Sequence, residues 1–133
     1  MKILFIDDDQ ALSAVMSAAL TNAGFTVETA YNGTAGLNKA KSEQYNLILL
    51  DQVLPDISGN EILKEVKSNQ QLKAIPVLML SNFSQEELVK EAINLGAADY
   101  IYKYQIEPED LVNKIKQVFA DQTTQAQQAP TTN

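Results

Sequence analysis

The sequence contains neither cysteine nor histidine among its 133 residues. The first absence excludes disulfide bonds and thiol chemistry, and the second excludes Ser–His and Cys–His catalysis and histidine-ligated metal sites. Basic residues are also scarce, with ten against 17 acidic ones, a formal net charge of −7 and no basic run. This balance argues against nucleic acid or a membrane as a direct partner.

Long apolar segments are missing as well. The apolar run in the opening MKILFIDDD is too short for a signal peptide, and no stretch is long enough to cross a bilayer. We therefore predict a cytoplasmic protein. What the sequence does have is a hydrophobic content of 45 %, in a length that suits one domain with a sizeable core.

Short apolar runs alternate with stretches of helical spacing. Strands are predicted at Lys2–Ile6, Phe25–Ala30, Asn46–Leu50, Pro76–Leu80 and Asp99–Tyr102. Phe25–Ala30 alternates, whereas Asn46–Leu50 is a continuous apolar run, which is typical of parallel strands that are covered on both faces. Five strands alternating with five helices predict an open α/β sheet with right-handed crossovers, because the chain is too short for an eight-unit barrel.

Helix signals separate the strands. Gly24 and Gly96 are predicted to end two helices, SGNE at Ser58–Glu61 and SQEE at Ser84–Glu87 have capping-box spacing, and Pro108 suits a first helical turn. In the first helix, the apolar residues at helical spacing are Leu12, Val15, Met16, Ala19 and Ala23. We predict a folded domain over residues 1–120. The Gln- and Thr-rich stretch 121–133 lacks large apolar residues and is predicted to be a disordered tail or linker stump.

Polar residues follow four of the predicted strands. In an open α/β sheet, ligands bind beyond the carboxyl ends of the strands. Asp7, Asp8 and Asp9 follow the first strand, Asp51 the third, Ser81 and Asn82 the fourth, and Lys103 the fifth. If the first and third strands are neighbours, Asp7, Asp8 and Asp51 converge.

Such convergence favours a bound cation. Two carboxylates about 4 Å apart repel by about 4 kcal/mol at an effective dielectric constant of about 20. An all-oxygen site suits Mg²⁺, with Mn²⁺ as a substitute. Held by the cation and by Lys103, the Asp51 carboxylate stays ionised and nucleophilic, and the same charges neutralise an incoming phosphoryl group. Ser81 has a hydroxyl to donate to it.

Each of these residues alone has an ordinary structural interpretation. Asp9 is better interpreted as a helix N-cap than as a ligand, and Asp7, Asp8 or Asp51 alone would also suit a cap. Ser81 alone suits a turn, and Lys103 alone a solvated charge. It is their joint occurrence at the strand ends that favours a phosphoryl site.

Over roughly residues 2–120, the sequence resembles the receiver domain of two-component response regulators. FIDDD is similar to the acidic pair of that family, and LLDQVLPDISG to its phosphoacceptor signature, with Leu54 in place of the usual methionine. VLMLSN and GAADYIYK resemble the strands that end in a hydroxyl residue and in a lysine. The resemblance implies a doubly wound, flavodoxin-like fold with five helices and a five-stranded parallel sheet in the order 2-1-3-4-5.

The resemblance also implies a role for each site residue. Asp51 is expected to be phosphorylated, and Asp8 and Asp51 to bind Mg²⁺ directly. The backbone carbonyl of Val53 is expected to help, and Asp7 to act partly through water. Lys103 is expected to pair with the phosphoryl group.

A switch is implied by the same resemblance. Ser81 would move to hydrogen-bond the phosphoryl group, and Tyr100 would then rotate inward. The alternative for Tyr100 is a half-exposed tyrosine in an edge-strand row with Tyr102 and Tyr104. The implied partners are a histidine kinase or histidine phosphotransfer protein as donor, a downstream protein target, and a phosphorylation-dependent homodimer. The chain would catalyse its own phosphorylation and dephosphorylation and no other reaction.

Some residues depart from the family pattern. Tyr104 stands where proline usually follows the lysine, and Asn82 stands where alanine is common. Val53 and Phe83 are apolar at the two positions that flank the route of an attacking water, which predicts slow hydrolysis of the acyl phosphate. A cis bond before Tyr104 would be far costlier than one before proline, so the loop after Lys103 is expected to differ.

Other functions remain open at this point. A pseudo-receiver that binds proteins but takes no phosphate is disfavoured by the complete residue set. A Mg²⁺-dependent aspartyl phosphohydrolase resembling the haloacid dehalogenase family would have a second aspartate at the position of Val53. A flavodoxin is disfavoured because the acidic turn after the first strand would repel a flavin phosphate.

Overall fold

The computed structural model describes residues 1–81 and 86–128. Strands and helices alternate in this order: β1 (Lys2–Ile6), α1 (Gln10–Asn22), β2 (Thr26–Ala30), α2 (Gly33–Ser42), β3 (Leu47–Asp51), α3 (Gly59–Ser68), β4 (Val77–Ser81), α4 (Glu86–Asn94), β5 (Asp99–Tyr102) and α5 (Pro108–Gln128). The predicted alternation is therefore confirmed. None of the helices in the described ranges is long and apolar enough to cross a membrane.

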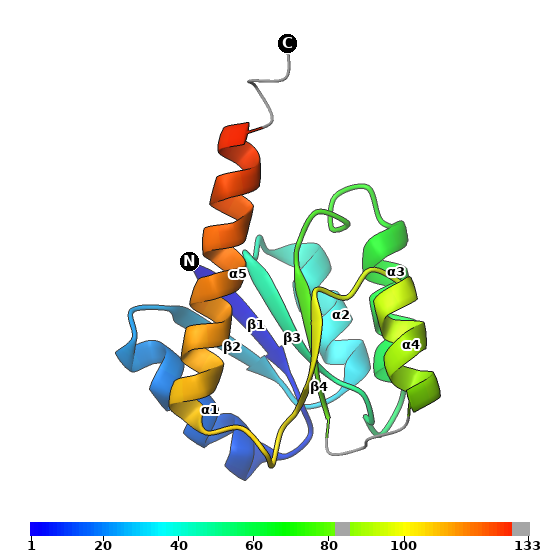
Figure 1. Ribbon diagram of the computed structural model, residues 1–133. Helices are drawn as coiled ribbons and strands as arrows, with labels where there is room; N and C mark the ends of the chain where they lie inside the picture. Colours follow the sequence, from blue (N-terminus) through cyan, green and yellow to red (C-terminus); the bar gives the residue numbers. More distant parts are fainter. Residues whose placement is uncertain (82–85, 129–133) are drawn as a thin grey trace.

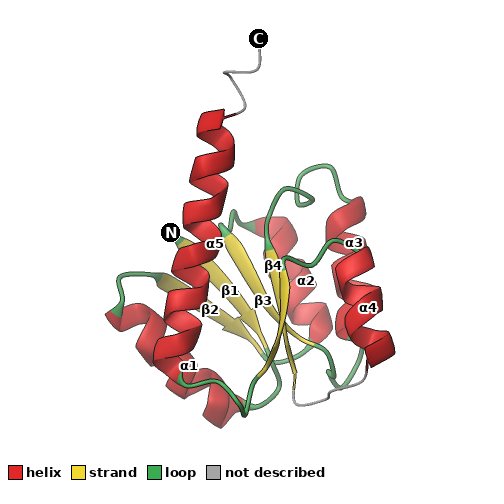
Figure 2. Cartoon of the chain, viewed as in Figure 1, coloured by secondary structure: helices red, strands yellow, loops and turns green. Residues whose placement is uncertain are grey.

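The five strands form one parallel sheet in the order β2-β1-β3-β4-β5. Helices α1 and α5 cover one face, and α2, α3 and α4 cover the other (Figures 1 and 2). This is the doubly wound, flavodoxin-like arrangement that the sequence predicted. All strands point the same way, so their carboxyl ends gather at one edge of the sheet.

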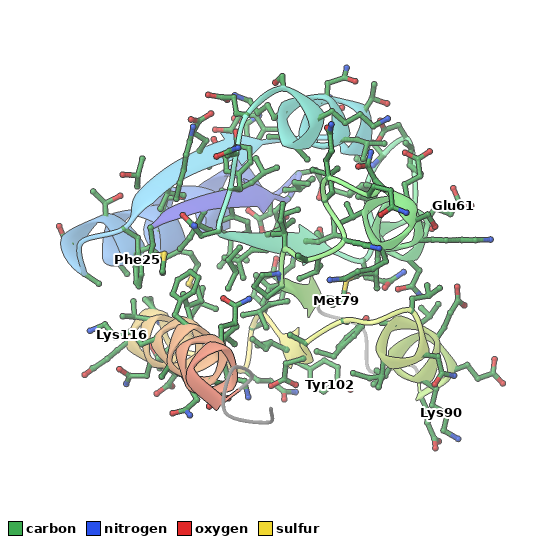
Figure 3. The ribbon with its side chains drawn as sticks, turned by 90° about the horizontal axis from the view of Figure 1, so that it is seen from above. Phe25, Glu61, Met79, Lys90, Tyr102 and Lys116 are labelled. Carbon is green, nitrogen blue, oxygen red and sulfur yellow. The ribbon has the colours of Figure 1, made fainter. Side chains whose placement is uncertain are left out.

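The core is split into two layers by the sheet. Leu47 and Leu49 of β3 pack on the side of α1 and α5, and Ile48 and Leu50 pack on the side of α2, α3 and α4. All four are fully buried, and each such side chain contributes about 1.5–3 kcal/mol by leaving water. Figure 3 shows Met79 inside these layers, with charged side chains of α4 and α5 pointing outward. The central strands thus give the polar residues at their ends a rigid base.

Several predicted helix ends are confirmed. The Asp9 side chain accepts a hydrogen bond from the Leu12 N–H at 3.0 Å, as an N-cap does, and Ser58 Oγ accepts one from the Glu61 N–H at 3.2 Å. Gly24 and Gly96 follow α1 and α4 with φ of 99° and 103°, a backbone conformation that glycine adopts at little cost. The predicted box at Ser84–Glu87 lies partly outside the described residues.

Several boundaries differ from the prediction. Strands β3 and β4 each end one residue later than predicted, at Asp51 and Ser81, because the parallel ladder pairs Asp51 with Leu80 and Ser81 with Tyr102. Helix α5 continues to Gln128, so the start of the predicted disordered tail is helical. No glycine or proline interrupts the chain between Pro108 and Pro130, so the preceding turns can propagate into this stretch.

One residue of the helically spaced apolar set in the first helix does not face the core. Val15 is 55 % exposed, although it was assigned to the apolar face of the first helix. The face of α1 that meets the sheet carries Met16 and Leu20, which are both buried, together with Ser13. Val15 precedes Met16 by about 100° around the helix and so lies on its outer side.

Candidate functional site at the carboxyl ends of the strands

Backbone ladders carry the charged residues to the edge of the sheet. The N–H of Asp7 donates to the Ala30 carbonyl at 3.0 Å, and the N–H of Lys103 donates to the Ser81 carbonyl at 2.9 Å. Both residues thus continue the hydrogen-bond ladder of the strands that they follow. Since Ile6 and Leu50 are paired in register, Asp7 and Asp51, which follow them, lie on the same face of the sheet.

The Lys103 ammonium joins the two buried carboxylates. Its Nζ lies 3.2 Å from both carboxylate oxygens of Asp7 and 3.2 Å from Oδ2 of Asp51. Asp7 is 0 % exposed, Asp51 2 % and Lys103 5 %. Two buried negative charges therefore share one buried positive charge, and the exposed Asp8 adds a third carboxylate at the rim.

The pKa values of this group reflect the shortage of positive charge. Burial raises the pKa of Asp51 to about 7, with Asp7 acting in the same direction and Lys103 opposing. Burial lowers the pKa of Lys103, but the carboxylates of Asp51 and Asp7 outweigh it, so the net shift is upward. Lys103 therefore stays protonated. Its single positive charge is shared between Asp7 and Asp51 and does not neutralise both carboxylates.

Three carboxylates could share a metal ion. Asp7, Asp8 and Asp51 each offer an oxygen, and these oxygens lie within 4.8 Å of one another. A cluster made of oxygen donors fits a hard divalent cation such as Mg²⁺ or Mn²⁺. Nearby, the Val53 N–H donates to Asp51 Oδ1 at 3.4 Å, while the Val53 side chain is 48 % exposed. The predicted ligation by the Val53 carbonyl stays a prediction.

The predicted switch residues lie next to this cluster. Ser81 is the last residue of β4 and is fully buried. The hydroxyl oxygen of Tyr100 is also buried. Burial raises the pKa of Tyr100, and the neighbouring Ser81 acts against that effect. The Tyr100 hydroxyl thus lies in the interior, and the switch role of Ser81 and Tyr100 stays a prediction.

Comparison with known proteins identifies the family. The model of the response regulator receiver domain matches residues 3–116. The chain belongs to this family. It is the receiver domain of a two-component response regulator, as the acidic cluster and the bridging lysine led us to expect.

Individual relatives agree with this assignment. The probable transcriptional regulatory protein SilR of Salmonella typhimurium is 39 % identical over 103 residues, which are 77 % of this chain and 44 % of SilR. A CheY-like receiver domain of Methanospirillum hungatei JF-1 superposes with a TM-score of 0.87 at 32 % identity, covering 93 % of this chain and 97 % of that one. The Mn²⁺-bound response regulator Rcp1 gives a TM-score of 0.75 at 29 % identity, over 88 % of this chain and 90 % of Rcp1. The receiver domain spans about half the length of the curated relatives that it matches.

One contact of the receiver domain was not foreseen from the sequence. The Tyr104 hydroxyl donates to Asp9 Oδ2 at 2.6 Å, and the centre of its ring lies 5.7 Å from Lys103 Nζ. The peptide bond before Tyr104 is trans, as are all the peptide bonds of the described residues. In the sequence, Tyr104 stood out only as a departure from proline, and Asp9 only as a cap. The one signal for their contact was that Asp9 directly follows Asp8 and Tyr104 directly follows Lys103. Asn82 and Phe83 lie outside the described residues.

Proposed function

We propose that Asp51 accepts a phosphoryl group from a phosphohistidine on another protein. The observation that carries this proposal is the buried Lys103 ammonium, which lies within 3.2 Å of both Asp7 and Asp51. The ammonium holds the Asp51 carboxylate at the end of the central strand. One positive charge does not balance the three carboxylates of Asp7, Asp8 and Asp51. The donor must come from a partner because this chain has no histidine.

The transfer forms one bond and breaks another. An oxygen of the Asp51 carboxylate attacks phosphorus, the P–N bond of the donor breaks, and the imidazole nitrogen leaves with the electron pair. The product is an acyl phosphate on Asp51. Lys103 then pairs with a phosphoryl oxygen, and Ser81 donates its hydroxyl to another.

Asp7, Asp8 and Asp51 are the residues that would hold Mg²⁺, with the Val53 carbonyl completing the set. When bound, Mg²⁺ or Mn²⁺ supplies positive charge that offsets the carboxylates and the phosphoryl oxygens. The Mn²⁺-bound structure of Rcp1 supports this choice of cation. Beyond its own phosphorylation and dephosphorylation, the domain catalyses no reaction in this proposal.

Phosphorylation would shift a two-state equilibrium. Ser81 and Tyr100 would couple the phosphoryl group to the surface of α4, β5 and α5, where a downstream protein or a second copy of the domain binds. The donor is a histidine kinase or histidine phosphotransfer protein, which this protein would meet in the cytoplasm. The name of SilR suggests transcription as the output of a longer protein, while the acidic receiver itself makes no direct contact with nucleic acid.

Intact mass spectrometry tests the proposal. Incubation with acetyl phosphate and Mg²⁺ is expected to give a single phosphate adduct that is absent in Asp51→Asn and in the presence of EDTA. Asp110→Asn, which changes an exposed aspartate in the first turn of α5, is the matched control and keeps the adduct. An adduct that survives in Asp51→Asn would relocate the site. No adduct in the wild type would favour a pseudo-receiver, and continuous release of phosphate from a phosphomonoester would favour a hydrolase.

A further inference from the structure

Tyr104 closes a ring of polar contacts at the rim of the site. Its hydroxyl donates to Asp9 Oδ2 at 2.6 Å, and the backbone N–H of Asp9 donates to Asp7 Oδ1 at 2.9 Å. Asp7 accepts from Lys103 Nζ at 3.2 Å, and Lys103 is bonded through the backbone to Tyr104. The loop after β1 and the loop after β5 are thereby tied together by side chains as well as by the sheet.

We infer that Tyr104 is a positioning residue for the cation site, a role that rests on the proposed function. Its hydroxyl acts through Asp9 to hold the segment 7–9 in the arrangement that brings Asp7 and Asp8 toward Asp51. The hydrogen bond of the Tyr104 hydroxyl goes to Asp9 and not to one of the three candidate ligands. Its effect is on how well the ligands are placed before the cation arrives.

Asp9 is suited to transmit this effect because both of its carboxylate oxygens are used. Oδ1 accepts from the Leu12 N–H and caps α1, while Oδ2 accepts from Tyr104. Asp8 lies between two residues that are both held, although its own side chain is exposed. Hydrogen-bond partners behind a metal ligand orient it and strengthen metal binding.

The aromatic ring has a second part in this arrangement. Tyr104 is 62 % exposed, yet Lys103, which lies under its ring at 5.7 Å from the centroid, is 5 % exposed. This distance is within the range of a cation–π contact. The hydrogen bond from the Tyr104 hydroxyl to Asp9 fixes the ring over the ammonium. A phenylalanine would keep the ring but lose this hydrogen bond.

A double-mutant cycle with Mg²⁺ alone as the probe tests the inference. Titration calorimetry measures the affinity of the wild type, Tyr104→Phe, Asp9→Asn and the double variant, without any phosphodonor. Asparagine at position 9 can still cap α1, but it has no negative charge to accept the hydrogen bond of the Tyr104 hydroxyl. We expect Tyr104→Phe to bind Mg²⁺ about tenfold more weakly, the lower end for loss of a partner behind a metal ligand. In the Asp9→Asn background, the same change should alter the affinity by less than about twofold, since its partner is gone.

A control and a rescue separate positioning from folding and from chemistry. Tyr31→Phe removes the hydroxyl of another exposed tyrosine and is expected to leave Mg²⁺ affinity unchanged. At saturating Mg²⁺, the rate of phosphorylation of Tyr104→Phe by acetyl phosphate should return to the wild-type value. The inference is overturned if Tyr104→Phe and the wild type bind Mg²⁺ with equal affinity. It is also overturned if Tyr104→Phe weakens Mg²⁺ binding by the same factor in the wild type and in Asp9→Asn. Failure of the wild type to take phosphate would instead overturn the proposed function, and the Mg²⁺ cycle would still decide the role of Tyr104.

Discussion

Asp51 is a carboxylate whose ionisation is opposed by its surroundings. It is 2 % exposed, and burial together with Asp7 raises its pKa to about 7. In an unfolded chain, the pKa of aspartate is about 3.9. The native state therefore keeps the proton over a range of pH in which the unfolded state has lost it. Stability is then expected to fall as pH rises from about 4 to about 7 and to level off above that.

A comparison of pH 5.5 with pH 8 measures this effect. In EDTA, we expect the free energy of unfolding of the wild type, from urea denaturation, to drop by about 2 kcal/mol between these values. Asp51→Asn should lack this drop and be the more stable of the two at pH 8. The absence of histidine and cysteine leaves few other groups that titrate in this range. Parallel pH profiles of the two proteins would contradict the assignment of the shift to Asp51.

Val53 is the residue that bears on the lifetime of the phosphorylated state. Its apolar side chain lies two residues after Asp51, is 48 % exposed and offers nothing to orient a water molecule. We expect the acyl phosphate to last for minutes or longer with Mg²⁺ present, and Val53→Asn to shorten its half-life severalfold. The decay of the phosphorylated mass peak after removal of the donor measures this. Val15→Asn, at an exposed valine on α1, is the control, and a wild-type half-life of seconds would contradict the prediction.

The charged residues of the site were predictable because each stands directly after a buried strand. A parallel sheet brings such positions to one edge, and this does not depend on the conformation of the loops. The sequence did not distinguish Asp7, which is buried, from its exposed neighbour Asp8, because burial depends on the direction of the chain as it leaves β1. The bond between Tyr104 and Asp9 was also out of reach, since it depends on how two loops approach each other.

At the scale of elements, the connection from β3 to α3 depends on Gly59. Its N–H donates to the Gln52 carbonyl at 2.8 Å, so the start of α3 packs directly on the end of β3. A Cβ at this position would collide with the backbone oxygen of Asp51 and would lie 2.8 Å from Gln52 Cα. These are backbone atoms, which cannot move aside as a side chain can.

We therefore expect Gly59→Ala to separate α3 from β3. The free energy of unfolding should fall by about 1–3 kcal/mol, the usual range for overpacking, and Mg²⁺ affinity should fall with it because Asp51 is displaced. Urea denaturation and calorimetry measure the two quantities. Lys64→Ala, at an exposed position of the same helix, is the control. A variant as stable as wild type with unchanged Mg²⁺ affinity would show that the connection tolerates the methyl group.

Element types were easier to predict than element boundaries. The strands were found because runs such as Leu47–Leu50 are apolar throughout, as a strand buried on both faces requires. The ends of β3 and β4 were missed by one residue, since ladder pairing extends to polar residues that periodicity excludes. Val15 was misplaced for a related reason. Helical spacing identifies an apolar side of the helix but does not show which residues of that side face the sheet.

At the scale of the whole molecule, the site and the end of α5 lie at opposite ends of the sheet. Figure 1 shows the last turns of α5 rising past the strands, away from the edge where the strands end. Among the α5 residues whose side chains the structure describes (108–122), those that contact the core come early: Leu111, Val112, Ile115 and Phe119 are buried, and Val118 is partly so. The folded domain predicted over residues 1–120 already contains these contacts.

Truncation after Asp121 is expected to leave the domain intact. The free energy of unfolding should change by less than about 0.5 kcal/mol, because residues 122–133 include no large apolar side chain to bury and helical turns alone add little stability in water. Mg²⁺ affinity should not change, and far-UV circular dichroism should lose helical signal without a shift of the urea midpoint. A loss of more than about 1 kcal/mol would mean that the segment after Asp121 makes contacts that stabilise the fold. The domain would then extend into the stretch whose composition alone suggested a tail, and its boundary would be set by packing rather than by the change in sequence character.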